Sequence, residues 1–201
     1  HLHARAGGMK VYANEETFNG MNFRLPEERR QLFSTGDAFQ IGDLEIRTFA
    51  VSHDAADPVG YSISCEGRSI TIVTDTGAVT GPLMEEIRTA DILVLESNHD
   101  ESILRMGRYP WFLKQRILGE RGHLSNEAAA LALAEVLQEE KNTGRKKCRR
   151  VLLAHLSREN NFPEMAMATV ENILEERGCP AGNETQLIAL SRTEISPLFS
   201  V

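Results

Sequence analysis

The chain has 201 residues, 41% of them hydrophobic and 25% charged, which suits one folded globular domain and excludes wholesale disorder. Apolar runs such as Ile92–Leu95 are far shorter than the roughly 20 residues of a membrane span, and the N-terminus has no apolar stretch that could act as a secretory signal. The net charge of −7 argues at first against a polyanionic partner.

The first half of the chain has short apolar runs separated by turn residues, which predicts strands. Strands are expected at 38–41 and 44–51 around Gly42-Asp43, and at 59–65 and 69–73 around a second turn. Each pair should form a hairpin. The continuous apolar run 92–96 is typical of a strand that is covered on both faces.

The second half adds helices. Ser125 is a suitable N-cap for a helix over 126–141, and Pro163 suits the first position of a helix that stops at Gly178. Further strands are expected at 151–155 and 186–191. Hairpins followed by alternating strands and helices predict a layered α/β or α+β protein, with a single domain over residues 1–201.

The positive charges are concentrated in one part of the chain. Residues 105–150 contain 11 Lys and Arg against 5 Asp and Glu, a net of +6, so the remainder carries 11 − 24 = −13. Such a local excess could bind phosphate groups. We interpret the run 141–150 as a solvated turn between a helix and a strand. The group 105–121, interleaved with aromatic residues, is the better candidate for ligand contact, and Arg108 and Trp111 are the expected substrate-binding residues.

The three cysteines form no Cys-x-x-Cys pair, and an odd number argues against a framework of disulfides. Their simplest interpretation is as buried or incidental thiols in a reducing compartment, which predicts a cytoplasmic protein with no membrane partner.

Three residues with metal-binding side chains come directly after predicted strands: His53, Asp75 and His155. If those strand ends lie side by side, the three side chains converge on one edge of the sheet, where rigid strand ends can hold ligands closely. Two imidazoles and a carboxylate suit zinc, manganese or iron. Each residue alone could equally be structural, and Asp75 could be an ordinary turn residue. The repeated placement favours a metal site.

Other polar residues could take part in chemistry. His123 lies two residues before the predicted N-cap Ser125, where an imidazole could donate a proton to a developing oxyanion. Alternatively, His123 packs in the loop and only Ser125 matters, as a cap. Glu96 and His99 lie just past another strand end, and their pattern alone is that of an ordinary acidic loop.

Several stretches resemble, in order, the metallo-β-lactamase superfamily and, within it, the YycJ/WalJ group of bacterial metallohydrolases. They are Val11-Tyr-Ala-Asn14, Val51-Ser-His-Asp-Ala-Ala-Asp-Pro-Val-Gly-Tyr61, Thr74-Asp-Thr-Gly77, Glu96-Ser-Asn-His-Asp100, Met106-Gly-Arg-Tyr-Pro-Trp111, Gly122-His-Leu-Ser-Asn-Glu127 and Leu153-Ala-His-Leu-Ser-Arg-Glu-Asn-Asn161.

The resemblance implies two β-sheets sandwiched between helices, an αββα arrangement, with a metal site at one edge. It implies His53 and His155 as metal ligands and Asp75 as the carboxylate that bridges two divalent ions, Zn²⁺ or Mn²⁺. The segment around His123 is similar to the Gly-His-Ser stretch of the tRNA-processing ribonuclease Z branch, which implies His123 as the leaving-group acid and Glu96 as its support. The implied activity is hydrolysis of phosphodiesters in nucleic acid, above all of DNA by a 5′-to-3′ exonuclease.

The superfamily's main metal motif, His-x-His-x-Asp-His, is absent. His1 and His3 match its first half, but Arg5 and Ala6 stand where Asp and His belong, and the motif should lie further upstream. We therefore expect a chain that is incomplete at its N-terminus, assign neither His1 nor His3 as a ligand, and expect fewer than two ions or none to bind. Two alternatives stay open: hydrolysis of a small ester, lactone or thioester, which needs an enclosed pocket without basic residues, and a metal-deficient chain without activity.

Overall fold

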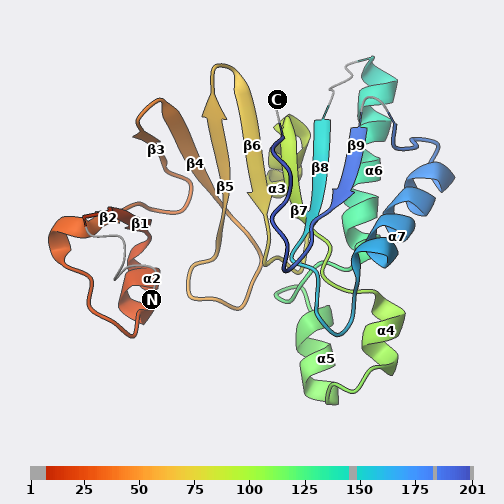
Figure 1. Ribbon diagram of the computed structural model, residues 1–201, viewed down its shortest axis with the longest axis horizontal. Coiled ribbons are helices and arrows are strands. Elements are labelled where there is room, and N and C mark those ends of the chain that lie inside the picture. Colours follow the sequence, from red (N-terminus) through yellow and green to blue (C-terminus); the bar gives the residue numbers. More distant parts are fainter. Residues whose placement is uncertain (1–7, 145–148, 183–184, 200–201) are drawn as a thin grey trace.

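The computed structural model describes residues 8–144, 149–182 and 185–199. Its centre is a seven-stranded mixed sheet in which the strands are ordered as they follow in the chain (Figure 1). The strands are β3 (Ala38–Ile41), β4 (Leu44–Ala50), β5 (Val59–Cys65), β6 (Arg68–Val73), β7 (Ile92–Glu96), β8 (Arg149–Ala154) and β9 (Thr185–Ala189). The pairs from β3 to β6 are antiparallel, and those from β6 to β9 are parallel. Both predicted hairpins and the α/β class are confirmed.

Local chemistry explains these strands. The turns that close the hairpins contain Gly42 at φ +61° and Gly67 at φ +76°, a backbone conformation that glycine adopts without steric cost. In the parallel half, Leu93 and Leu95 of β7 and Val151 and Leu153 of β8 are fully buried. Their apolar side chains favour this central position, in which neighbouring strands and helices exclude water.

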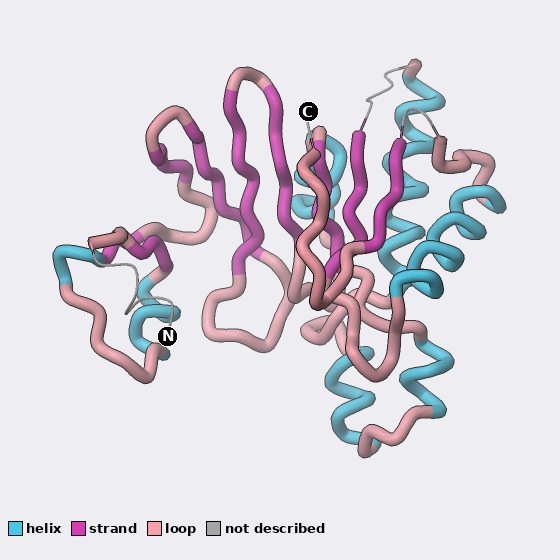
Figure 2. Tube along the Cα trace, viewed as in Figure 1, coloured by secondary structure: helices cyan, strands magenta, loops and turns pink. Residues whose placement is uncertain are grey.

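Three helices cover one face of the sheet: α3 (Gly81–Thr89), α6 (Asn126–Thr143) and α7 (Pro163–Glu176). In Figure 2, α3 and α6 lie behind the strands. The Ser125 side chain accepts a hydrogen bond from the backbone N–H of Ala128 at 3.1 Å, so the predicted N-cap is confirmed. Buried side chains such as Leu133 and Val170 then join the helices to the sheet in one core. Within the described residues, no helix is long and apolar enough to cross a membrane.

The opposite face of the sheet carries apolar side chains in register. Ile63 of β5 pairs with Ile70 of β6, which pairs with Ile92 of β7. Residues 190–199 cross this face in front of β7 (Figure 1). The second large sheet that the resemblance implies is not found among the described residues.

The N-terminal part forms a small unit beside the sheet, with β1 (Val11–Ala13), α2 (Glu15–Gly20), a short 3₁₀ turn (Glu27–Arg29) and β2 (Arg30–Leu32). Strands β1 and β2 are parallel and enclose Ala13, Phe18 and Leu25. The side-chain amide of Asn14 donates to the carbonyl of Asp57 at 2.7 Å and so links this unit to the loop between β4 and β5.

Two short helices, α4 (Glu101–Met106) and α5 (Trp111–Leu118), project from the end of the sheet at which β6, β7 and β8 finish (Figure 1). The periodicity of the sequence did not predict them or α3, because helices of six to nine residues span too few turns for a clear pattern.

One interpretation from sequence is wrong. The run 141–150 is not solvated throughout, because Arg149 is 2% exposed. Its guanidinium donates to the carbonyl of Arg88 at 3.2 Å and to the carboxylate of Glu140. Residues 145–148 lie outside the described residues, as do His1 and His3.

Candidate metal centre and catalytic site

The parallel strands bring three polar residues to one edge of the sheet. Glu96 is the last residue of β7 and pairs with Ala154, so His155 follows immediately beside it. On the other side of β7, Val73 pairs with Leu95, and Asp75 follows two residues later. Because parallel strands end at the same edge, Asp75, Glu96 and His155 meet there. The sequence placed Asp75 and His155 at this edge together with His53, but not Glu96.

Two of these residues have an unusual backbone. Asp75 has φ +56° and His155 has φ +57°, and both are in the left-handed region that residues with a Cβ rarely occupy. Each follows a strand, so the left-handed turn changes the chain direction at once and holds the side chain at the sheet edge. Strained backbone of this kind is concentrated at functional sites.

Asp75 lies at the centre of three histidines. Its Oδ1 is 3.8 Å from Nε2 of His53 and 3.6 Å from Nε2 of His155. The same oxygen is 3.7 Å from Nδ1 of His123. Potential ligand atoms of Asp75, Glu96, His123 and His155 all lie within 4.8 Å of one another. The five residues assigned to the metal and to catalysis therefore lie together in the structure.

Hydrogen bonds fix which nitrogen of each ring faces the cluster. Nδ1 of His53 is 2.9 Å from the carbonyl oxygen of Gly122, and because a carbonyl only accepts, this nitrogen carries the proton. Nδ1 of His155 and Nδ1 of His123 are each 2.7 Å from Oε1 of Glu96. Such bonds leave the Nε2 lone pair of His53 and of His155 available toward Asp75, as in metal sites whose histidines are oriented by a second bond.

These hydrogen bonds shift the pKa values of Glu96 and His155. Burial alone would raise the pKa of Glu96, but hydrogen bonds from His123, His155 and the backbone N–H of Thr76 outweigh it and lower the pKa. The hydrogen bond to Glu96 raises the pKa of His155. Glu96 is fully buried, so its charge is compensated by these three donors instead of by water.

The donor set fits a divalent metal. Imidazole nitrogens and a carboxylate oxygen are the ligands that zinc and manganese take in proteins, and no thiolate lies among these groups. His53, Asp75 and His155 would hold the ion, while Glu96 is occupied by its three hydrogen bonds. A carboxylate that bonds the ligand histidine is a typical outer partner in metal sites.

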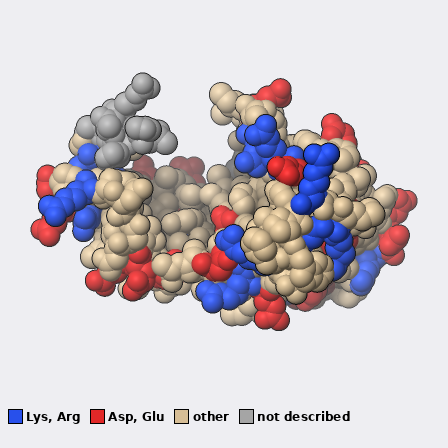
Figure 3. Space-filling view, turned by 90° about the horizontal axis from the view of Figure 1, so that it is seen from below, with Lys and Arg blue, Asp and Glu red and all other residues tan. Residues whose placement is uncertain are grey.

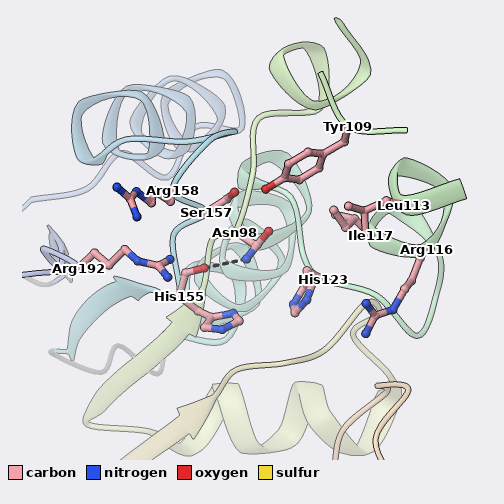
Figure 4. A pocket seen from close by; sticks show the side chains of 10 residues that line it. All are labelled: Asn98, Tyr109, Leu113, Arg116, Ile117, His123, His155, Ser157, Arg158 and Arg192. Atoms are coloured by element: carbon pink, nitrogen blue, oxygen red, sulfur yellow. Dashed lines mark hydrogen bonds between the residues drawn. The ribbon is translucent and has the colours of Figure 1, made fainter. Parts of the chain in front are cut away.

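A buried amide network, which was not predicted from the sequence, lies beneath the site. The hydroxyl of Ser97 donates to Oδ1 of Asn126 at 2.6 Å, and the amide of Asn161 donates to the same oxygen at 2.8 Å. Asn98 donates to the carbonyl of His155 at 2.8 Å, which is the dashed line of Figure 4. The Ser-Asn pairs after β7 and before α6, and the Asn-Asn pair before α7, were the only signal in the sequence.

Most of the basic group 105–121 is used within the protein. Nζ of Lys114 donates to the carbonyls of Arg105 and Gly107 at 2.6 and 2.7 Å. The guanidinium of Arg116 binds both carboxylate oxygens of Asp54, at 2.5 and 3.0 Å, and lowers the pKa of that carboxyl to about 2. The guanidinium of Arg121 donates to the carbonyl of His53 at 3.1 Å.

The expected substrate-binding residues, Arg108 and Trp111, are both on the surface. Trp111 begins α5 and is 62% exposed, and Arg108 is exposed in the turn between α4 and α5. Figure 3 looks onto this end of the molecule and shows blue Lys and Arg side chains around a tan area of uncharged atoms, with red carboxylates between them. Neither Arg108 nor Trp111 lines the cavity beside His123 and His155.

That cavity has a volume of about 310 Å³ and opens next to the cluster of Asp75, Glu96, His123 and His155. Figure 4 shows His123 and His155 at its inner end, with Tyr109 and Arg116 on one side and Arg158 and Arg192 on the other. A group bound there would therefore lie against both histidines.

Comparison with known proteins agrees with the fold. Residues 1–143 match the profile of the "Beta-lactamase superfamily domain". The chain is 42% identical over 187 residues to "Exodeoxyribonuclease YycJ" of Bacillus anthracis, covering 92% of this chain and 68% of the relative. It is 35% identical over 211 aligned residues to "Exodeoxyribonuclease WalJ" of Streptococcus pneumoniae, covering 100% of this chain and 76% of the relative.

Solved structures share the architecture. The metallo-beta-lactamase fold protein YhfI from Bacillus subtilis matches with a TM-score of 0.56 at 13% identity, covering 89% of this chain and 61% of that one. Zn²⁺-bound PqqB from Methylobacterium extorquens matches with a TM-score of 0.51 at 17% identity, covering 80% and 54%. The predicted metallo-β-lactamase fold is confirmed, and the chain spans about two thirds of the length of its curated relatives. The chain belongs to the beta-lactamase superfamily of metal-dependent hydrolases.

Proposed function

We propose that the protein hydrolyses phosphodiester bonds in DNA, as a metal-dependent exonuclease that works in the 5′-to-3′ direction. The observation that carries the proposal is the placement of His123, anchored by Glu96, beside Asp75 and His155 at the wall of an arginine-lined cavity. The two curated relatives named as exodeoxyribonucleases support the choice of DNA. The unpaired thiols of Cys65 and Cys179 are consistent with a cytoplasmic location.

In this proposal, His53, Asp75 and His155 hold the metal, which is Zn²⁺ or Mn²⁺. Divalent ions in such a site neutralise charge on the phosphate and activate water for attack. The chain's own contribution is geometric: β6 and β8 fix Asp75 and His155 at the sheet edge, and Gly122 and Glu96 orient the imidazoles of His53 and His155.

His123 is assigned to the leaving group. Its Nδ1 bonds Glu96, so Nε2 is the atom that can hold a proton and donate it to the departing oxygen. The leaving group in DNA is an alkoxide, a strong base that departs slowly unless it is protonated. Glu96 fixes the orientation of the ring through a bond of 2.7 Å.

We further propose that this chain of 201 residues binds fewer than two ions tightly and that its activity is correspondingly low. Two ions need more protein ligands than His53, Asp75 and His155 supply, because a catalytic zinc ion usually takes three of its own. Calorimetric titration with Zn²⁺ and Mn²⁺ tests this part. Two tightly bound ions per chain would contradict it.

The assignment of His123 is tested by varying the leaving group. At saturating Mn²⁺, His123→Ala should cleave a DNA oligonucleotide at least 100-fold more slowly than the unmodified chain. It should lose much less on bis(p-nitrophenyl) phosphate, whose p-nitrophenolate departs without a proton. His155→Ala should slow both substrates, because it removes a metal ligand.

Arg177→Ala is a matched control, since Arg177 is exposed at the far end of α7. Undiminished metal-dependent DNA cleavage by both histidine variants would overturn the proposal. Hydrolysis of p-nitrophenyl acetate or a lactone, without cleavage of either phosphodiester, would instead favour the small-ester alternative. Oligonucleotides labelled at the 5′ or the 3′ end determine the direction of digestion.

A further inference from the structure

Two arginines line the cavity beside Asp75, Glu96, His123 and His155 but form no hydrogen bond or salt bridge with these four described residues. Arg158 and Arg192 both line it, next to His155 (Figure 4). Within the described part of the chain, neither arginine forms a salt bridge. Arg116 on the opposite wall differs, because Asp54 neutralises it through two hydrogen bonds.

Arg192 is also held in place. Its Nη1 donates to the carbonyl of Leu156 at 3.2 Å, which fixes the guanidinium next to the residue that follows His155 in the chain. A guanidinium has five N–H donors, so most of them remain available to a ligand. Across the cavity, the hydroxyl of Tyr109 points toward Ser157 (Figure 4). The walls therefore offer two arginines that no carboxylate of the described residues neutralises, together with an aromatic hydroxyl.

These features define the ligand by its chemistry. Planar guanidinium groups match the oxygens of a phosphate group and bind it through paired hydrogen bonds. A volume of about 310 Å³ is at the small end of ligand pockets, which favours one nucleotide over a duplex segment. Because His123 and His155 form the inner wall, the bound group adjoins the place at which a metal ion held by Asp75 and His155 would bind the scissile phosphate.

We propose that this cavity binds the nucleotide next to the scissile bond, with Arg158 and Arg192 holding its phosphate and Tyr109 contacting its sugar or base. The inference rests on the proposed phosphodiesterase function and adds to it a site for one substrate unit. Arg158 and Arg192 are specificity residues here, because they contact a neighbouring phosphate and not the reacting atoms.

Binding without turnover tests the site directly. In EDTA, fluorescence anisotropy of a labelled single-stranded oligonucleotide should show displacement by thymidine 5′-monophosphate at least tenfold more effectively than by thymidine. The variants Arg158→Ala and Arg192→Ala should each weaken oligonucleotide binding about tenfold and remove the advantage of the monophosphate. Arg158→Lys and Arg192→Lys should restore part of the affinity, and Arg177→Ala should bind as the unmodified chain does.

Kinetics separate this inference from the proposed function. With Mn²⁺, Arg158→Ala and Arg192→Ala should lower kcat/KM for the oligonucleotide about tenfold, mainly through KM. Hydrolysis of bis(p-nitrophenyl) phosphate should fall by much less, because that substrate has no neighbouring phosphate. If the unmodified chain cleaves DNA and the arginine variants bind and cleave it equally well, the site is refuted while the function stands. If the unmodified chain cleaves neither phosphodiester but still shows the arginine-dependent preference for the monophosphate, the proposed function fails and the binding site stands.

Discussion

Glu96 and His155 are joined by a hydrogen bond of 2.7 Å, from Nδ1 of the imidazole to the same carboxylate oxygen, Oε1, that accepts a bond from His123. One buried carboxylate thus orients a predicted metal ligand and a predicted acid at once. The other oxygen, Oε2, accepts the backbone N–H of Thr76 at 2.8 Å, directly after Asp75. Glu96 lies at the end of β7, and its hydrogen bonds therefore connect the end of β6 to the end of β8.

Replacing Glu96 by glutamine should affect both histidines. In Glu96→Gln, one acceptor oxygen becomes an amide donor, so the donors at His123, His155 and Thr76 compete for a single oxygen. We expect Mn²⁺ or Zn²⁺ affinity to fall 10- to 100-fold, as for other carboxylates that orient a metal-bound histidine. Titration calorimetry measures the loss. Glu101→Gln is the matched control, because Glu101 pairs with Arg105 on the exposed surface.

The same variant should alter the dependence of stability on pH in the metal-free protein. The raised pKa of His155 means that its bond to Glu96 contributes fully below the ordinary value of 6.5 and is lost as pH rises through the raised pKa. The lowered pKa of Glu96 means that its contribution is present above the ordinary value of 4.5 and lost as pH falls. Urea unfolding in EDTA should therefore show a decline above pH 6.5 that Glu96→Gln weakens. An identical decline in both proteins would contradict this account.

A second prediction concerns His99, which is 1% exposed and whose two ring nitrogens find no hydrogen-bond partner among the described residues. Burial lowers its pKa from 6.5 to about 4. The unfolded chain therefore takes up a proton before the folded protein does, and stability falls as pH drops from 6.5 toward 4. The cost approaches about 3 kcal/mol, at about 1.4 kcal/mol per pKa unit.

His99→Leu should remove this dependence. Leucine has no titratable group and leaves no buried polar atom without a partner, so the substitution should be nearly neutral at pH 7.5 and stabilising at pH 5. Urea unfolding in EDTA at the two pH values measures the difference. A variant that is destabilised equally at both values would show instead that His99 makes a contact that leucine cannot replace.

The buried strands β7 and β8, and the metal-type residues placed at strand ends, could be predicted from the sequence because both depend on local signals. The apolar runs of β7 and β8 mark buried strands, and ligands placed just after strands must meet at one edge. The amide network could not be predicted in this way, because its Ser-Asn and Asn-Asn pairs do not show which partners they meet. Asn126 and Asn161 lie 35 residues apart, and only the packing of α6 against α7 brings them together.

The basic residues at 105–121 show a second limit of prediction from sequence. Charge counting identified Arg116 and Lys114 as candidates for ligand contact, but it cannot reveal which charges are already compensated. Asp54, the partner of Arg116, is 62 residues away in the sequence. Conversely, Arg158 and Arg192 lie outside the basic segment, and only the fold places them beside His155. Arg149 was misjudged for the same reason, since its partner carbonyls come from α3, 61 and 62 residues away.

A third prediction follows from the left-handed backbone of His155, at φ +57°. A residue with a Cβ in this region costs roughly 1–2 kcal/mol more than glycine. His155→Gly should therefore be about 1 kcal/mol more stable than His155→Ala in EDTA, although both lose the metal ligand. His53 provides the control, because its φ is not positive. There the glycine variant should be the less stable of the two, since glycine gains more entropy on unfolding.

The last prediction concerns the close contact between the loops that carry Asp75 and His123. A Cβ at Gly122 would overlap the backbone of Arg116 and Ile117, and one at Gly77 would overlap the backbone of Gly119 and Gly122. Because backbone atoms cannot give way as a flexible side chain can, Gly122→Ala should lower the free energy of unfolding by at least about 2 kcal/mol. It should also slow DNA cleavage, since His123 follows directly and the carbonyl of Gly122 accepts a hydrogen bond from Nδ1 of His53.

Gly81→Ala serves as its control, because a Cβ at Gly81 meets open space at the start of α3 and alanine favours a helix. That variant should unfold at equal or slightly higher urea concentration and keep its activity. If Gly122→Ala were as stable as Gly81→Ala, the loops that carry Asp75 and His123 would be able to move apart without lowering the free energy of unfolding. The close backbone contact would then not be what fixes His53 and His123 on either side of Asp75.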